Sequence, residues 1–497
     1  MAERTSIFSI FLALCFSVAL SRTLPSQTPQ KTTLLDVSAS IQKTLDLFSP
    51  ESTQLSQLRH THSPQPTKSL SFHLHSRSTA HKAQHRDYKS LTLARLARDA
   101  ARAETLQTRL DLAVNRISLT DLEPENNNNN DDVVFDEEEE VLQGPVVSGT
   151  SQGSGEYFLR VGIGQPPSQV SLVIDTGSDV NWVQCAPCAD CYTQTDPIYN
   201  PSNSTSFYPL TCNTDQCRSL DVSSCFNNTC MYEVSYGDGS YTVGDFVTET
   251  ISFAGGGSDA VSNIAIGCGH NNEGLFVGAS GLIGLGAGSL SFPSQINASS
   301  FSYCLVDRDS DNSSLLEFNS GMPYDGVVTA PIIKNSKLDT FYYVALTGLS
   351  VSGELLSIPP ATLSLDQSGN GGVIVDCGTA VTRLQTAAYG SLRDAFRNGT
   401  KGLRRRDGGV ALFDTCYDMS GMKSVEVPTV AFRFSNGKEL ELPAKNYMIP
   451  VDSNGTFCFA FAPTESSLSI IGNVQQQGIR VDFDIANSMV GFSPSSC

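Results

Sequence analysis

The sequence predicts an all-β protein made of two related lobes, and three observations support this fold class. From residue 144 onward, short apolar runs alternate with clusters of Gly, Pro, Asn and Ser, a pattern typical of strands joined by turns. One motif, an apolar run followed by Asp, a small residue, Gly and a hydroxyl residue, occurs at 172–178 and again at 373–379. A chain of 497 residues is also too long for a single hydrophobic core.

The first 21 residues have the features of a signal peptide. Arg4 precedes an apolar run from Ile7 to Leu20, and the sequence Ala-Leu-Ser at 19–21 fits a cleavage site. The run is too short for a stable membrane span, and no other segment of the chain is suited to one. We therefore expect entry into the secretory pathway at the endoplasmic reticulum, with the apoplast, the vacuole or the endoplasmic reticulum itself as the final site.

Residues 22–143 differ in composition from the rest and are expected to form a removable pro-segment. Residues 22–119 hold 14 Lys and Arg against 7 Asp and Glu, whereas residues 144–497 hold 17 against 33. Leucines between Leu91 and Leu110 recur at helical spacing, and the polar tract with Asn126–Asn130 and Glu137–Glu140 fits a cleavable linker. A basic strip of this kind could cover an acidic cleft and leave on acidification.

Six of the seven histidines also fall in this segment. Metal binding by them is the weaker alternative, because their spacing is irregular and no cysteine joins them.

The two repeated motifs each present an aspartate, Asp175 and Asp376, where a buried strand meets a tight turn. If the lobes pack together, these carboxylates can share one proton, which is the apparatus of acid–base hydrolysis. Matching apolar segments with glycine, 281–286 and 470–474, each follow about a hundred residues later. The plain alternative is that Asp-Gly turns are common in β proteins, but two matched copies make it the weaker reading. The lobes are expected to span 144–326, with a cysteine-rich insertion at 185–230, and 327–497.

A helix is expected at Ala387–Asn398, with Gly399 as its C-cap, followed by a solvated loop at Arg404–Arg406.

The cysteines and the glycosylation sequons both fit an oxidising compartment. Of the 14 cysteines, Cys15 lies in the signal peptide and the rest begin at residue 185. The disulfide candidates are Cys185, Cys188, Cys191, Cys212, Cys217, Cys225, Cys230, Cys268, Cys304, Cys416, Cys458 and Cys497. The glycosylation candidates are Asn203, Asn227, Asn297, Asn312, Asn398 and Asn454.

Several other functions are disfavoured by the sequence. The acidic body is a poor binder of nucleic acid or of an anionic membrane. The spacing of Cys185, Cys188 and Cys191 could suggest zinc, but secretion and the many nearby cysteines favour disulfides. A Ser/His/Asp triad is not credible because His270 is the only histidine after residue 144. We expect no metal and no cofactor.

The motifs resemble those of the pepsin-like aspartic proteases, across essentially all of residues 150–497. Besides the two Asp motifs and the two glycine segments, Tyr236-Gly-Asp-Gly-Ser at 236–240 is similar to the family's flap hairpin. The cysteine-rich insertion after the first motif is similar to that of the plant nepenthesin-type branch. The resemblance implies a bilobal pepsin-like fold with the active-site cleft between the lobes.

By the same resemblance, Asp175 and Asp376 would hold the nucleophilic water of an endopeptidase acting at acid pH. Ser178 and Thr379 would orient the outer carboxylate oxygens, and the amides of Gly177 and Gly378 would support them. Tyr236, with Gly237, Asp238 and Gly239, would close over the substrate, and Trp182 stands where the family places a partner for the flap tyrosine. The alternative for Trp182 is a core residue.

Cys377 departs from the family pattern, which has Thr or Ser at this position. Thr176 can still reach across to the opposite loop, but a thiol is a weaker donor on a longer bond. If the 12 other cysteines after residue 184 pair, Cys377 is left over as a buried free thiol. We interpret it as a tolerated packing substitute, and a redox-sensitive site is the alternative.

The implied partners are polypeptide substrates and the chain's own pro-segment as an intramolecular inhibitor, and a monomer is expected. A second hypothesis is a catalytically silent pepsin-like scaffold that binds a protein or glycan, as an inhibitor of hydrolases would. Silent members tend to lose an Asp, its flanking hydroxyl or the flap tyrosine, and here all of these are present.

Overall fold

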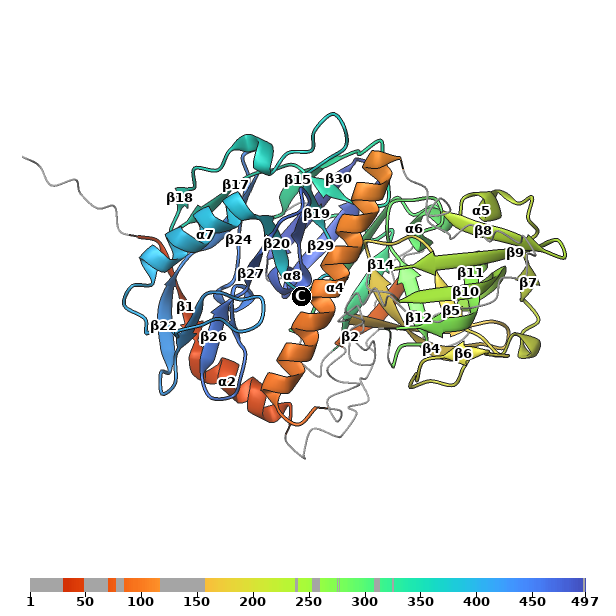
Figure 1. The fold of residues 1–497 in the computed structure, drawn as a ribbon, viewed down its shortest axis with the longest axis horizontal. Helices are drawn as coiled ribbons and strands as arrows, with labels where there is room; N and C mark the ends of the chain where they lie inside the picture. The colour runs from red at the N-terminus through yellow and green to blue at the C-terminus, as the bar shows by residue number, and fades with distance from the viewer. Residues whose placement is uncertain are drawn as a thin grey trace, which may run out of the picture.

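A computed structural model describes residues 30–48, 70–76, 85–116, 157–236, 240–252, 260–274, 276, 278–307, 313–323, 326–494 and 497. The signal peptide and the polar tract at 126–140 lie outside these residues, as do Gly237, Asp238 and Gly239. Strands dominate the described chain after residue 157, which confirms the all-β prediction, and they form two lobes (Figure 1).

The described residues before 117 contain four elements, one of which is a long helix. They are β1 (Thr32–Asp36), α2 (Val37–Asp46), β2 (Leu70–Ser76) and α4 (Tyr88–Asn115). β1 pairs with β22 of the second half, whereas β2 lies between β3 and β14. The helix α4, in orange, runs diagonally over the junction of the green and the blue lobes (Figure 1).

The first lobe contains strands β3 to β12 and two short helices. Its strands are β3 (Tyr157–Ile163), β4 (Ser168–Asp175), β5 (Trp182–Gln184), β6 (Asp190–Cys191), β7 (Tyr208–Pro209), β8 (Val222–Phe226), β9 (Thr229–Ser235), β10 (Tyr241–Ser252), β11 (Ala260–Glu273) and β12 (Gly281–Gly284). The helices are α5 (Asp215–Arg218) and α6 (Phe292–Gln295), and a 3-10 turn spans Pro201–Asn203.

The chain then continues through the sheet between the lobes into the second lobe. The strands are β13 (Ser300–Cys304), β14 (Ser313–Phe318), β15 (Val328–Ile333), β16 (Tyr343–Val344), β17 (Leu346–Val351), β18 (Glu354–Leu355), β19 (Val373–Val375), β20 (Thr382–Gln385), β21 (Cys416–Asp418), β22 (Ser424–Pro428), β23 (Val430–Phe434), β24 (Glu439–Glu441), β25 (Met448–Pro450), β26 (Thr456–Phe459), β27 (Phe461–Thr464), β28 (Ser469–Ile471), β29 (Ile479–Asp484) and β30 (Met489–Pro494). The helices are α7 (Thr386–Gly399) and α8 (Asn473–Gln476), with 3-10 turns at Pro360–Thr362 and Ala444–Asn446.

The two motif strands have the same surroundings in both lobes. β4 runs parallel to β12, with Asp175 opposite Gly284, and β19 runs parallel to β28, with Val375 opposite Ile471. In each lobe the strand after the motif pairs antiparallel to the strand of the glycine segment, as β5 does with β12 and β20 with β28. The glycine segments therefore lie beside the Asp motifs, as their matched spacing suggests.

Two glycines allow this close approach. A Cβ on Gly284 would lie 2.5 Å from the backbone of Asp179, and one on Gly472 would lie 2.6 Å from the carbonyl oxygen of Ala380. Asp179 and Ala380 each stand four residues after the motif aspartate, so the two contacts are equivalent. Any larger residue at either glycine would force the Asp loop away from its neighbour.

The predicted helix at 387–398 exists, but its end differs slightly from the prediction. α7 runs through Gly399 and is capped by Thr400. Gly399 is small because a Cβ there would meet Pro428 at 2.4 Å, which is a packing requirement.

Within the described residues, no helix combines the length and apolar character that a membrane crossing requires.

Candidate active site

The carboxylates of Asp175 and Asp376 lie close together at the junction of the lobes, each at the end of its strand. Both side chains are buried, with 2% and 0% of their surface exposed. The guanidinium of Arg102 contacts both of them. A Cβ on Gly378 would lie 2.6 Å from Asp175 Oδ1, so the two Asp loops pack directly against each other.

Each carboxylate is oriented by the residues that follow it in its own loop. Ser178 Oγ donates to Asp175 Oδ2 at 2.6 Å, and the amide of Gly177 donates to Oδ1 at 2.9 Å. Thr379 Oγ1 donates to Asp376 Oδ2 at 2.6 Å, as its own amide does at 2.8 Å. The Gly378 amide donates to Asp376 Oδ1 at 3.3 Å. For Asp175, burial raises the pKa, whereas the hydrogen bonds from Ser178 and Gly177 lower it.

Thr176 ties the two loops together from one side. Its hydroxyl lies 3.2 Å from Asp376 Oδ1 and 3.4 Å from the carbonyl oxygen of Val375, and it accepts the amide of Cys377 at 2.9 Å. From the other side, Cys377 Sγ reaches the carbonyl oxygen of Ile174 at 3.8 Å. The link between the loops is therefore asymmetric. Thr176 contributes a hydroxyl oxygen at hydrogen-bond distance, whereas Cys377 contributes a sulfur that lies farther from its acceptor.

Burial, together with the charges of Asp376 and Asp175, raises the pKa of the Cys377 thiol well above its ordinary value. Cys377 is also the one free cysteine among the described residues. The 12 candidate cysteines form six disulfides: Cys185–Cys268, Cys188–Cys191, Cys212–Cys225, Cys217–Cys230, Cys304–Cys497 and Cys416–Cys458. Thus Cys185, Cys188 and Cys191 are engaged in disulfides.

The hairpin of β9 and β10 places Tyr236 beside Trp182. Trp182 Nε1 donates a hydrogen bond to Tyr236 Oη at 3.1 Å. The amide of Tyr236 donates to the carbonyl oxygen of Ser240 at 2.8 Å, across the hairpin. Phe276 lies edge-on to both rings. Trp182 is 1% exposed, so it is both a core residue and the hydrogen-bond partner of the tyrosine.

Arg102 of α4 fills the space between the two carboxylates. Its Nη2 lies 2.5 Å from Asp175 Oδ1, and its Nε lies 3.6 Å from Asp376 Oδ2. Burial lowers the pKa of Arg102, but attraction to Asp175 and Asp376 outweighs it, and the pKa is raised. For Asp175, burial is the stronger influence. It raises the pKa of Asp175, Arg102 lowers that pKa, and the net result is a raised pKa.

Further polar contacts fix α4 against both Asp loops and their neighbours. Asp99 accepts hydrogen bonds from the amides of Ala380 and Val381 and pairs with Arg383. Arg109 Nη1 donates to the carbonyl oxygen of Gly177 at 2.9 Å, and Gln107 donates to Thr464 Oγ1 at 2.6 Å. The helix thus contacts both lobes.

The leucine periodicity predicts α4 itself but misses this charged face. Leu91, Leu96, Leu106 and Leu110 are buried as a helical stripe would have them, whereas Leu93 is exposed. Arg95, Arg98, Asp99 and Arg102 are buried as well. A sequence offers no apolar signal for such residues, although the excess of basic charge in residues 22–119 points toward an acidic partner surface.

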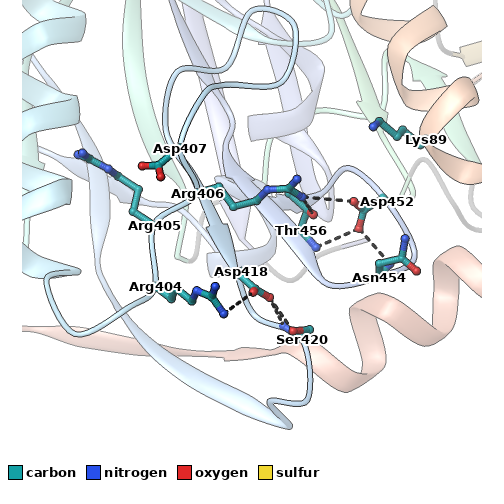
Figure 2. Close-up of a pocket in the computed structure, with 10 residues that line it drawn as sticks. All are labelled: Lys89, Arg404, Arg405, Arg406, Asp407, Asp418, Ser420, Asp452, Asn454 and Thr456. Carbon is teal, nitrogen blue, oxygen red and sulfur yellow. Dashed lines mark hydrogen bonds and ion pairs between the residues drawn. The ribbon is translucent and has the colours of Figure 1, made fainter.

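A separate hollow of 630 Å³ lies at the foot of α4 and reaches Lys89 (Figure 2). Arg404 pairs there with Asp418 at 3.4 Å, and Arg406 lies 3.9 Å from Asp452. The side chain of Arg404 is 82% exposed, which agrees with the solvated loop expected from the sequence. Neither motif aspartate lines this hollow.

The glycosylation candidates are dispersed over both lobes. Asn203, Asn227, Asn297, Asn398 and Asn454 are exposed, and Asn312 lies outside the described residues. Among the described residues there is no cluster of His, Cys, Asp and Glu suited to a metal ion.

A two-lobed β fold that brings one aspartate from each lobe to a shared centre defines the class of aspartic proteases. The xylanase inhibitor N-terminal family matches residues 157–319, and the xylanase inhibitor C-terminal family matches residues 341–494. Aspartyl protease family protein 2 of Arabidopsis thaliana is 54% identical over 362 residues, covering 71% of this chain and 73% of that protein. The chain belongs to the plant branch of the pepsin-like aspartic proteases.

Two further relatives and two solved structures agree with this. Protein ASPARTIC PROTEASE IN GUARD CELL 2 of Arabidopsis thaliana is 49% identical over 71% of this chain and 75% of its own. Aspartic proteinase nepenthesin-1 of Nepenthes gracilis is 40% identical over 72% of this chain and 82% of its own. The crystal structure of edgp has a TM-score of 0.57 at 20% identity, over 70% of this chain and 93% of that one. The crystal structure of Basic 7S globulin from soybean has a TM-score of 0.55 at 19% identity, over 68% of this chain and 93% of that one. These two structures show the fold alone.

Proposed function

We propose that the protein is an aspartic endopeptidase that acts at acid pH through a water molecule held between Asp175 and Asp376. The observation that carries this is the pair of buried carboxylates, each oriented by a hydroxyl and an amide of its own loop. One carboxylate would act as base on the water while the other, protonated, polarises the scissile carbonyl. The two titrate as a unit, so neither role is assigned to one residue.

The hairpin of β9 and β10 would close over the bound peptide. Tyr236 is held by Trp182, and such a hairpin also offers backbone groups to an extended chain. Closure excludes water from the reacting centre, which strengthens the electrostatic interactions there.

We further propose that the uncleaved chain is an inactive zymogen, with residues 22–143 as its intramolecular inhibitor. Arg102 occupies the position that the attacking water needs, and α4 covers the cleft on both sides of it. Removal of α4 after cleavage in the segment 117–156 would free the carboxylates. The lobes proper would then be 144–326 and 327–497.

We propose the localisation of the protein from its sequence and its disulfides. A signal peptide at 1–21, glycosylation at exposed sequons and six disulfides all fit the secretory pathway. The protein would act there as a monomer on polypeptide substrates.

A silent scaffold is the competing proposal, since the matched families carry the name xylanase inhibitor. The complete set of aspartates, flanking hydroxyls and flap tyrosine speaks against it. The test is hydrolysis of a denatured protein at acid pH by the chain freed of residues 1–143, with and without pepstatin, beside Asp175→Asn. Activity that disappears with the inhibitor and in the variant supports the endopeptidase. Inactivity of the folded, freed chain supports the scaffold.

A further inference from the structure

We propose that Arg383 and the backbone amides of Ala380 and Val381 form a subsite that binds an acidic side chain of the substrate. The subsite is revealed by its occupant in the uncleaved chain, the carboxylate of Asp99. Asp99 Oδ1 accepts the amides of Ala380 and Val381 at 2.5 and 3.0 Å. Arg383 Nη2 donates to the other oxygen at 2.5 Å. The proposal rests on the endopeptidase function given above.

The subsite belongs to the enzyme body and follows directly from the Asp376 loop. Ala380 and Val381 continue that loop, and Arg383 lies on β20. Pairing of β20 with β27 and β28 holds Arg383 opposite Ala462 and Ile470. Two amides and a guanidinium in a fixed arrangement match the geometry of a carboxylate, and a guanidinium binds such a group through two of its nitrogens.

Among the described residues, Arg383 has an unused donor and no second carboxylate partner. Its side chain is 6% exposed, and within the described chain its Nη1 has no hydrogen-bond partner. Asp99 is the one carboxylate with which it pairs in that part of the molecule. When α4 leaves, the guanidinium loses its counter-charge in a place where charge is costly to leave unpaired. A carboxylate from the substrate would restore the pair.

The surroundings of the subsite are apolar and favour binding of a charged group to Arg383. Leu96, one turn before Asp99, packs with Ala380, Val381, Phe413 and Val474. With α4 and its Leu96 removed, Ala380, Val381, Phe413 and Val474 would be exposed beside the guanidinium. An apolar wall lowers the local dielectric and strengthens a charge-assisted hydrogen bond.

The position of the subsite relative to the cleaved bond follows from helix geometry. Asp99 and Arg102 are three residues apart on α4, a rise of about 4.5 Å along the axis. An extended peptide advances about 3.3 Å per residue. Because Arg102 marks the catalytic centre, the selected side chain lies within about two residues of the bond that is cleaved.

The pH dependence of this preference has a definite sign. A substrate Glu has an ordinary pKa of about 4.3, whereas Arg383 stays charged throughout. Pairing with Arg383 lowers the pKa of the bound Glu, so the preference for Glu over Gln is present above that range and is lost as the pH falls. Other charged groups on the helix side, Arg102 and Asp99 among them, depart with α4. On the enzyme side, Asp376 stands at the start of the same loop, seven residues before Arg383.

The test uses the activated protein and pairs of peptides that differ only by Glu or Gln at each of three positions on both sides of the cleaved bond. At one position we expect kcat/KM for Glu to exceed that for Gln by roughly tenfold at pH 5.5, and by less at pH 3. Arg383→Gln should bring the ratio close to one, and Arg383→Lys should leave it between the two. Arg393→Gln, which alters an arginine on α7 paired with Asp394 and Asp414, is the matched control and should keep the wild-type ratio.

A wild-type ratio near one at every position and pH would overturn the subsite, as would a ratio that Arg383→Gln leaves unchanged. The pH series of the wild-type protein needs no variant, so the proposal stays testable even if the variants do not fold. If the wild-type protein cleaves neither peptide of any pair, the endopeptidase function fails and the subsite fails with it.

Discussion

One difference between the two Asp loops lies in the residue after the aspartate, which is Thr176 in the first loop and Cys377 in the second. Thr176 makes three close contacts across the loop interface, whereas the thiol reaches the carbonyl oxygen of Ile174 only at 3.8 Å. A thiol is longer and a weaker donor than a hydroxyl, so the second Asp loop is held less firmly by this tie. Burial and two neighbouring carboxylates keep the thiol protonated, which favours a packing role over a redox role.

Replacing Cys377 by Ser is therefore expected to retain or increase activity. A hydroxyl can donate a shorter hydrogen bond to the carbonyl oxygen of Ile174 and make the two loops more alike. The measurement is kcat/KM of the activated variant on a neutral peptide, with circular dichroism as the check on folding. A folded variant that loses most of its turnover would contradict this interpretation.

Trp182 and Tyr236 are expected to act together through their hydrogen bond. Trp182→Phe and Tyr236→Phe should each lower kcat/KM, and the double variant should lose less than the sum of the two in free energy. The expected coupling is about 1 kcal/mol, the typical value of one buried hydrogen bond. A double-mutant cycle measures it, and strictly additive losses would argue against the pairing.

At the scale of elements, α4 is the proposed inhibitor of the uncleaved chain. It places one arginine between the carboxylates, one aspartate on the amides after Asp376 and one leucine in an apolar pocket. Helical spacing of leucines predicts the element, and basic composition predicts the sign of the surface that it covers. The register that selects Arg102 for the catalytic centre depends on the shape of the folded cleft, which no local pattern in the sequence encodes.

Arg102→Ala is expected to weaken the binding of α4 to the two Asp loops and to give the uncleaved chain activity. Removing one member of a buried ion pair leaves uncompensated charge and costs about 3–5 kcal/mol. The open fraction should therefore rise by roughly a hundredfold or more, measured as hydrolysis of a small peptide by the uncleaved chain. Arg116→Gln, at the exposed C-cap of the same helix, is the control. If neither uncleaved variant hydrolyses the peptide, the inhibitory role of Arg102 is contradicted.

Two buried carboxylates set the pH dependence of α4 docking. Burial raises the pKa of Asp175 and Arg102 lowers it, and the net result in the docked state is a raised pKa. Burial also raises the pKa of Asp99 while the helix is docked. A carboxyl group whose pKa is raised in the docked state takes up its proton there first, so both groups favour docking as the pH falls. Asp99→Asn in the uncleaved chain removes one of them and should therefore shift the balance toward release at low pH, as followed by peptide hydrolysis.

At the scale of the molecule, the symmetry of the two lobes is the part that the sequence predicts best. The repeated Asp motifs, the glycine segments and the number of cysteines that pair were all visible in the order of residues. The pairing itself was not, because Cys304 and Cys497 are brought together from 193 residues apart by the sheet between the lobes. The same holds for Arg383, which looks like an ordinary strand residue until a carboxylate is seen on it.

The Cys304–Cys497 disulfide is expected to contribute to the stability of this sheet. A cross-link over a long stretch of chain restricts the unfolded state, and removal of such a bond commonly costs about 2–5 kcal/mol. Replacing both cysteines by Ala should lower the midpoint of denaturant unfolding of the activated protein. An unchanged midpoint would show that strand pairing alone closes the lobes.

If the two lobes build one catalytic centre, this will show in the activities of Asp175→Asn, Asp376→Asn and the double variant. In a shared centre each single change removes the coupled pair, so each should lower kcat/KM by roughly 10³-fold or more, and the double variant should lose little beyond that. Losses that simply multiply in the double variant, or a single variant that keeps a large part of the activity, would contradict a single two-aspartate centre.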